Sequence, residues 1–221
     1  MIPKIFHHVW IGPKPMPKEE IEFRESFRKI HPDWKFMLWD NDSLPELDMP
    51  ENCLEAFNES NGKNQPTDPP CYACQADVVR AVAVLKYGGI YVDTDIECYK
   101  RIDDLLTEET KFIGIQPHKG NWITNAFFGA SKGFELMKNL VEDIRPKPPA
   151  HLGPMFLTNH LYIFLKKAVN SPPAHRISVQ DLNTKEIKIL SHTAWGLEHK
   201  NTYMRHYFKA SWIKKNQDNN V

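Results

Sequence analysis

The sequence lacks a net charge, a long apolar run and a dense set of cysteines. Its 28 basic residues balance 28 acidic ones, which argues against a general nucleic-acid binder, because such proteins normally carry a basic excess. The most apolar stretch, residues 78–92, is interrupted by Arg80, Lys86 and two glycines, so it cannot form a membrane-spanning helix. Four cysteines do not make a disulfide scaffold, and the N-terminus lacks the order of a secretory signal. We therefore expect a cytoplasmic protein.

Length and composition indicate a folded α/β domain. Hydrophobic residues make up 41% and charged residues 25% of the 221 residues, which is ordinary for a globular protein with a core of its own. Apolar periodicity predicts strands at residues 5–10, 34–39 and 90–92, and helices at residues 18–30, near 51–59 and over 71–87. Strand and helix alternate, which indicates an α/β sheet. We expect one domain over residues 1–212 and a polar tail over residues 213–221.

The most informative region surrounds an Asp-x-Asp pair. The apolar strand predicted at residues 90–92 delivers Asp93 and Asp95 at its carboxyl end, where open α/β sheets place their ligands. Two neighbouring carboxylates repel each other, and a divalent cation such as Mg²⁺ or Mn²⁺ removes that cost. Asp77 and Arg80 share one face of the preceding helix, where they could hold sugar hydroxyls and a phosphate.

Each of these features also has a purely structural interpretation. Many Asp-x-Asp pairs bind no metal, and Asp77 with Arg80 could be an ordinary surface ion pair. Asp77 and Arg80 come shortly before Gly88-Gly89, an apolar strand and the Asp93–Asp95 pair. Together these features favour a ligand-binding site more strongly than any one of them does alone.

Cys71 and Cys74 allow two further hypotheses. A structural zinc site would need a second pair, and Cys53 and Cys98 are not spaced as one. A thioredoxin-like redox pair would directly follow a strand, whereas two prolines and a polar loop precede Cys71. We therefore expect two reduced thiols at the start of a helix.

Several segments together resemble glycosyltransferase family 32, in its DXD sugar-binding region. The core of the resemblance lies in residues 2–12 (IPKIFHHVWIG), 76–80 (ADVVR) and 87–95 (YGGIYVDTD). It extends over about residues 1–212, through residues 31–34 and 38–40, Gly153-Pro154 with Thr158, and His206 with Ser211-Trp212. Ala76 and Ala210 depart from the residues common in the family, and neither is an implied ligand. The family includes capsular and lipopolysaccharide transferases, yeast initiating mannosyltransferases and, more distantly, clostridial glucosylating toxins.

The resemblance implies a GT-A-type fold, with a nucleotide-binding sheet flanked by helices and an acceptor-side subregion. It implies catalytic roles for Asp77, Arg80, Asp93 and Asp95. The implied donor-binding residues are Val9 and Trp10 for the base, Asp77 and Arg80 for the sugar and its phosphate, Asp93 for hydroxyl groups, Asn125 in the wall of the site, and Ser211 and Trp212 near the diphosphate. Trp10 as a core aromatic and Asn125 as a buried turn residue remain open alternatives.

The implied metal ligand is Asp95, with Asp93 shaping the site and His206 as a further ligand. An imidazole among oxygen ligands would favour Mn²⁺ over Mg²⁺. The implied reaction is retaining transfer of a hexose from a nucleotide sugar, with UDP favoured, to a hydroxyl of a glycan or lipid-linked glycan, as in capsule or surface polysaccharide synthesis. No residue is marked as a nucleophile, and front-face attack needs none.

Two other function classes stay open. One is a phosphohydrolase of the haloacid dehalogenase type, in which the first Asp of the pair is the nucleophile; the other is a non-catalytic sugar-nucleotide-binding module. Lys166-Lys167 and Lys214-Lys215 suggest either peripheral contact with the inner face of a membrane or a solvated surface, and these pairs are too short for a polybasic anchor. Binding loops on the acceptor side are expected at residues 58–70, 116–123 and 146–153.

Overall fold

The computed structural model describes residues 1–60, 71–117, 121–146, 152–165, 182–195 and 202–209. At its centre is a six-stranded sheet with the order β2-β1-β3-β6-β5-β7. These strands are β1 (Ile5–Trp10), β2 (Lys35–Asp40), β3 (Gly89–Val92), β5 (Phe112–Ile115), β6 (Phe127–Ala130) and β7 (Ile187–Leu190). The pairs β1–β2, β1–β3 and β5–β7 are parallel, whereas β6 is antiparallel to both β3 and β5. A small second sheet pairs β4 (Ile96–Cys98) with β8 (Met204–His206).

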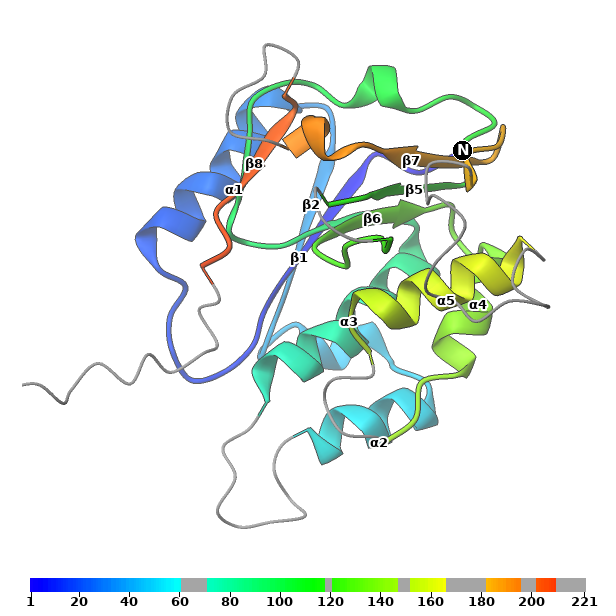
Figure 1. The fold of residues 1–221 in the computed structure, drawn as a ribbon. Coiled ribbons are helices and arrows are strands. Elements are labelled where there is room, and N and C mark those ends of the chain that lie inside the picture. The colour runs from blue at the N-terminus through cyan, green and yellow to red at the C-terminus, as the bar shows by residue number, and fades with distance from the viewer. Residues whose placement is uncertain (61–70, 118–120, 147–151, 166–181, 196–201, 210–221) are drawn as a thin grey trace, which may run out of the picture.

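Helices cover both faces of the large sheet (Figure 1). On one face lie α2 (Glu51–Glu59), α3 (Tyr72–Tyr87), α4 (Glu135–Glu142) and α5 (Pro154–Phe164). On the other face lie α1 (Lys18–Ile30) and the small sheet, over a second cluster of buried apolar side chains. Short 3₁₀ helices at Leu44–Leu47, Asp103–Leu105 and His192–Trp195 complete the described elements. The predicted α/β class is confirmed.

The side chains of β1 alternate between the two faces of the sheet, so this strand contributes to the buried cluster on each face. Phe6 faces α1 and packs on Phe27 and Trp34, with ring centroids 5.0 and 4.4 Å away. The next residue, His7, faces the α3 side, where it stacks near Trp39. Successive side chains of a strand point to opposite faces, so β1 buries side chains on both faces of the sheet, the two histidines His7 and His8 among them.

A glycine pair sets the path from α3 to β3. Gly88 and Gly89 both have positive φ values, +65° and +98°, which other residues adopt rarely. A Cβ atom on Gly89 would lie 2.5 Å from the carbonyl oxygen of Ile5. The pair therefore ends the helix, as predicted, and lets β3 run directly beside β1, so that Asp93 and Asp95 follow at the edge where parallel strands end.

Cys71 and Cys74 form a disulfide, so the prediction of two reduced thiols is wrong. Cys71 caps the start of α3, and its sulfur accepts a hydrogen bond from the backbone NH of Cys74 at 3.3 Å. One helical turn therefore brings the two residues to a Cα separation of 5.3 Å, within the usual range for a disulfide. Cys53 and Cys98 are free and buried.

Several predicted features lie outside the described residues. They are residues 61–70, 118–120 and 147–151 of the three predicted acceptor-side loops, the two lysine pairs and the tail at residues 213–221. Among the described helices, none combines the length and the apolar content that a membrane span requires.

Candidate functional site

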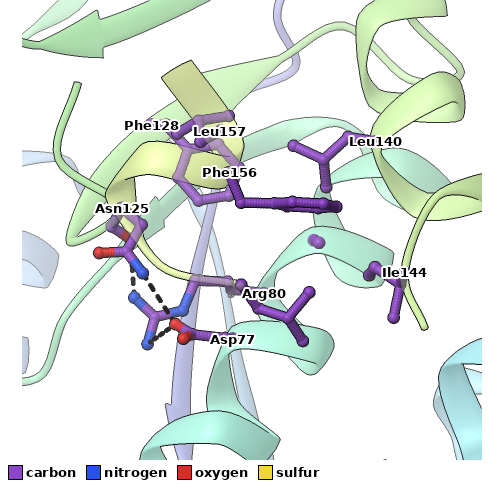
Figure 2. A pocket seen from close by; sticks show the side chains of 10 residues that line it. Asp77, Arg80, Asn125, Phe128, Leu140, Ile144, Phe156 and Leu157 are labelled. Carbon is purple, nitrogen blue, oxygen red and sulfur yellow. Dashed lines mark hydrogen bonds and ion pairs between the residues drawn. The ribbon is translucent and has the colours of Figure 1, made fainter. Parts of the chain in front are cut away.

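Arg80 joins helix α3 to the end of β3. Its guanidinium lies 3.1 Å from Asp77 Oδ1 and 3.2 Å from Asp93 Oδ1, and Figure 2 shows the Asp77 and Arg80 side chains side by side. The Arg80 and Asp77 side chains are only 9% and 12% exposed. The alternative of an ordinary surface pair is therefore wrong, because such pairs are well solvated.

Tyr91 supports this network from the strand. It lies two residues before Asp93, hence on the same face, and its hydroxyl donates to Asp93 Oδ1 at 2.5 Å. Its ring centroid lies 4.4 Å from Cζ of Arg80, a cation–π distance. Sequence reasoning missed Tyr91, although its two-residue spacing from Asp93 is the signal that could have found it.

Asn125 closes the network from the loop before β6. Its side-chain amide donates to Asp77 Oδ1 at 2.8 Å, and its backbone carbonyl accepts a bond from Arg80 at 2.7 Å. The loop is held by Thr158, whose hydroxyl accepts a bond from the backbone NH of Ile123 at 2.8 Å. Asn125 is thus bonded to a predicted sugar-binding residue, and its own role in binding stays a prediction.

Burial and charge together set the electrostatics of this network. Desolvation raises the pKa of Asp77 to about 7, against the opposing attraction of Arg80. Burial disfavours the charged form of Arg80 and lowers its pKa. The neighbouring Tyr91, Asp93 and Asp77 outweigh this effect, so the pKa of Arg80 lies above the ordinary value. Burial also raises the pKa of Tyr91 well above 10. The site therefore holds one permanent positive charge and a Tyr91 hydroxyl that stays protonated.

The three predicted metal ligands come together at the carboxyl end of β3. One ligand atom each from Asp93, Asp95 and His206 lies within 4.8 Å of the others. The antiparallel pairing of β8 with β4 places His206 opposite Ile96, and this brings His206 Nε2 to 3.1 Å from Asp95 Oδ1. Two carboxylates and one imidazole form a donor set that fits Mn²⁺, so these residues fit the implied cation.

Asp95 is kept ionised by its neighbours. Burial disfavours its charged form, but bonds from His206 and from the backbone NH of Lys209 lower its pKa below the ordinary value. The Lys209 NH donates to Oδ2 at 2.9 Å. A negatively charged Asp95 is the form that a metal ion needs.

A pocket begins at Asp77, Arg80 and Asn125 and continues between β6, α3, the α4 region and α5 (Figure 2). Its cavity volume is about 20 Å³, roughly the space of one water molecule, and it opens to solvent. Its remaining walls are apolar: Ala81, Phe128, Leu140, Ile144, Leu152, Phe156 and Leu157. The pocket thus has hydrogen-bonding groups at one end, next to the predicted sugar-binding residues, and an apolar wall at the other.

The implied base-binding residues lie at the end of β1. His7 is opposite Tyr91 in the parallel β1–β3 pair, so β1 and β3 end at the same edge of the sheet. The Val9 side chain is buried in the core, whereas Trp10 is half-buried and donates its indole NH to the Lys14 carbonyl at 2.8 Å. Their contact with a base stays a prediction. Ser211 and Trp212 lie outside the described residues.

Sequence comparison finds known proteins that are similar to the part of the chain that builds this site. Residues 17–112 match the family model described as "Glycosyltransferase sugar-binding region containing DXD motif". The matched segment contains Asp77, Arg80, Asp93 and Asp95. This part of the chain is thus similar to that glycosyltransferase region, and the predicted resemblance is confirmed.

Two curated relatives are similar over parts of their length. "Inositol phosphoceramide mannosyltransferase 3" of Schizosaccharomyces pombe is 27% identical over 172 residues, which are 78% of this chain and 43% of that protein. "Uncharacterized glycosyltransferase L373" of Acanthamoeba polyphaga mimivirus is 34% identical over 107 residues, 48% of this chain and 40% of that protein. The chain thus spans less than half the length of either relative.

Solved structures support the fold. The structure titled "PaToxG Glycosyltransferase" superposes with a TM-score of 0.59 at 18% identity, covering 75% of this chain and 70% of the other. This similarity confirms the predicted GT-A type of α/β fold.

Proposed function

We propose that this chain is a metal-dependent, retaining glycosyltransferase that moves a hexose from a nucleotide sugar to a hydroxyl of a glycan or glycolipid. One observation carries the proposal: Asp93 belongs both to the Asp93–Asp95–His206 cluster and to the Arg80–Asp77 network. A diphosphate bound at the cluster would therefore present its sugar to Asp77 and Asn125. The family match supports the transferase over the haloacid dehalogenase alternative.

Asp93, Asp95 and His206 would hold the cation, with Mn²⁺ favoured because one ligand is an imidazole. A cation bound there supplies Lewis-acid stabilisation of the departing nucleoside diphosphate. The three ligand residues would fix the position at which the negative charge of the departing diphosphate is stabilised.

Arg80 would stabilise the same developing charge without a proton transfer. Its guanidinium is held by Asp77, by the Asn125 carbonyl and by the Tyr91 ring, so it needs no rearrangement during the reaction. Asp77 and Asn125 would bind sugar hydroxyls beside it. Retention then proceeds by front-face attack of the acceptor hydroxyl, with the leaving phosphate taking the proton, and requires no enzyme nucleophile.

The donor and acceptor are assigned by analogy. We favour a UDP-sugar by analogy with other members of the family. The name of the S. pombe relative includes inositol phosphoceramide, a lipid, which supports a lipid-linked glycan as acceptor. We propose a role in capsule or surface polysaccharide synthesis, in the cytoplasm or at the inner face of the membrane.

The proposal is tested by slow hydrolysis of a panel of UDP- and GDP-sugars with Mn²⁺, comparing wild type with Asp95→Ala. We expect one or two donors to be hydrolysed, activity to be lost in EDTA, and the variant to lose at least about 10²-fold, because the cation contributes several kcal/mol. Asp42→Ala removes an exposed carboxylate elsewhere and serves as the control.

Other outcomes separate the alternatives. Unchanged turnover in EDTA would remove the metal from the mechanism. Hydrolysis of simple phosphate esters in place of sugar nucleotides would support the phosphohydrolase. Donor binding by calorimetry without hydrolysis or transfer would support a non-catalytic binding module.

A further inference from the structure

The last residue of β8 and the residues that follow it are bonded to Asp95 at three points. His206 Nε2 lies 3.1 Å from Asp95 Oδ1, the Lys209 NH donates to Oδ2 at 2.9 Å, and the Tyr207 NH donates to the backbone carbonyl at 3.0 Å. Lys209 is 114 positions from Asp95 in sequence. The orientation of the Asp95 carboxylate thus depends on a distant part of the chain, which some other element must hold in place.

Helix α1 provides that element through one aromatic side chain. The Phe23 ring stacks on Tyr207 with centroids 4.6 Å apart, and the ammonium group of Lys209 lies 5.1 Å from the same ring centroid. Phe23 is 6% exposed. Lys209 also forms an ion pair with Glu19 on α1. A single buried ring therefore contacts both residues whose backbone NH groups bond to Asp95.

Tyr207 is fixed from its other side as well. Its hydroxyl donates to Glu97 on β4 at 2.7 Å, and the Arg205 guanidinium lies 4.5 Å from its ring centroid. The backbone between His206 and Lys209 is thus held by contacts with β4 on one side and with α1 on the other, and Phe23 provides the apolar contact with α1.

We propose that Phe23 is a positioning residue for the cation site. By holding Tyr207 and Lys209 against α1, it fixes the backbone that presents His206 and orients Asp95. Groups that orient metal ligands without touching the metal typically change its affinity by about 10–100-fold. The inference rests on the cation site of the proposed function, and it is independent of the donor and acceptor.

The chain offers matched variants for the test. Phe23→Leu keeps an apolar side chain but removes the ring that stacks and attracts the ammonium group. Phe27→Leu is the control, because Phe27 lies one turn further along α1, is fully buried, and has ring contacts with Phe6, His8 and His31. Lys209→Met removes the second contact with Phe23, and Lys209→Arg should restore it.

The first readout is the affinity for Mn²⁺ alone, measured from the free-Mn²⁺ signal in electron paramagnetic resonance at a temperature where every variant is folded. We expect Phe23→Leu and Lys209→Met to weaken binding about tenfold. Phe27→Leu and Lys209→Arg should match the wild type, although Phe27→Leu loses at least as much thermal stability as Phe23→Leu.

The second readout is trypsin cleavage after Arg205. We expect Phe23→Leu to accelerate this cleavage, and added Mn²⁺ to slow it in the wild type more than in the variant. Phe27→Leu should be cleaved like the wild type.

The results that overturn the inference differ from those that overturn the function. Wild-type Mn²⁺ affinity in Phe23→Leu, or an equal loss in Phe23→Leu and Phe27→Leu, overturns the positioning role alone. A wild-type chain that binds no Mn²⁺ overturns the cation site, and the role of Phe23 with it.

Discussion

His206 Nε2 lies 3.1 Å from Asp95 Oδ1, and the pairing of β8 with β4 produces this contact. The two side chains face each other as two ligands of one ion would. The pairing therefore brings His206 to the two predicted ligands that follow β3, although it is far from them in sequence.

This contact predicts the metal preference of the reaction. In His206→Asp an oxygen ligand replaces the imidazole, so the preference for Mn²⁺ over Mg²⁺ should fall, because Mg²⁺ favours sites made of oxygen atoms alone. The measurement is kcat/KM for donor hydrolysis with each ion in turn. A Mn²⁺-to-Mg²⁺ ratio equal to that of the wild type would mean that His206 is not a ligand.

The second prediction concerns Arg80. Arg80→Lys keeps the charge, but one ammonium group cannot contact Asp77, Asp93 and the Asn125 carbonyl together. We expect a loss of about 3 kcal/mol in the free energy of unfolding, since buried carboxylates lose a partner, and about 10²-fold in donor hydrolysis.

Arg28→Lys is the matched control for this change. Arg28 pairs with Glu25 at a half-exposed position on α1, so its free energy of unfolding should change by less than about 0.5 kcal/mol. An Arg80→Lys variant as stable and active as the wild type would show that the buried network has no function.

Local signals explain why much of the fold was predictable. The bounds of α1 and α2 agree with the prediction, because their amphipathic periodicity ends at recognisable breakers such as Pro32. Strand β2 begins and ends one residue later than predicted, because Trp34 packs on Phe6 before the strand starts.

Residue spacing alone predicted the candidate site only where that spacing is local, whereas His206 and Asn125 were implied by the family resemblance. Asp77 with Arg80 and Asp93 with Asp95 are close in sequence, so their shared faces follow from helix and strand periods. Phe23 and Lys209 could not be found in this way, because their contacts depend on β8 returning to β4. The disulfide was missed for a different reason: the expected reducing compartment outweighed a three-residue spacing that suits it.

The third prediction is a loss of stability in acid, caused by His7. Its Nε2–H donates to the Gly88 carbonyl at 2.7 Å, and its Nδ1 accepts from the Trp39 indole at 3.1 Å, so both nitrogens suit only the neutral ring. Burial lowers its pKa from 6.5 to about 4. The unfolded chain therefore binds this proton at higher pH than the folded chain does.

The sign and size of the effect follow from this shift. The stabilisation is complete above about pH 6.5 and is lost progressively as the pH falls to about 4, by about 3 kcal/mol in all. His8, with its pKa lowered by burial to about 3, acts in the same direction. Urea unfolding of wild type and His7→Gln at about pH 7 and pH 4.5 tests this, and an identical pH dependence in the variant would contradict it.

The fourth prediction counts thiols. Cys71 and Cys74 are joined, whereas Cys53 and Cys98 are free, and burial raises the pKa of both free thiols to about 12. Because the thiolate is the reactive form, the folded chain should react slowly with a thiol reagent. Unfolding without reductant should release the two free thiols, and unfolding after dithiothreitol all four. A Cys71→Ser/Cys74→Ser variant should give the same count before and after reduction, and a wild-type count of four before reduction would show that the pair is not oxidised.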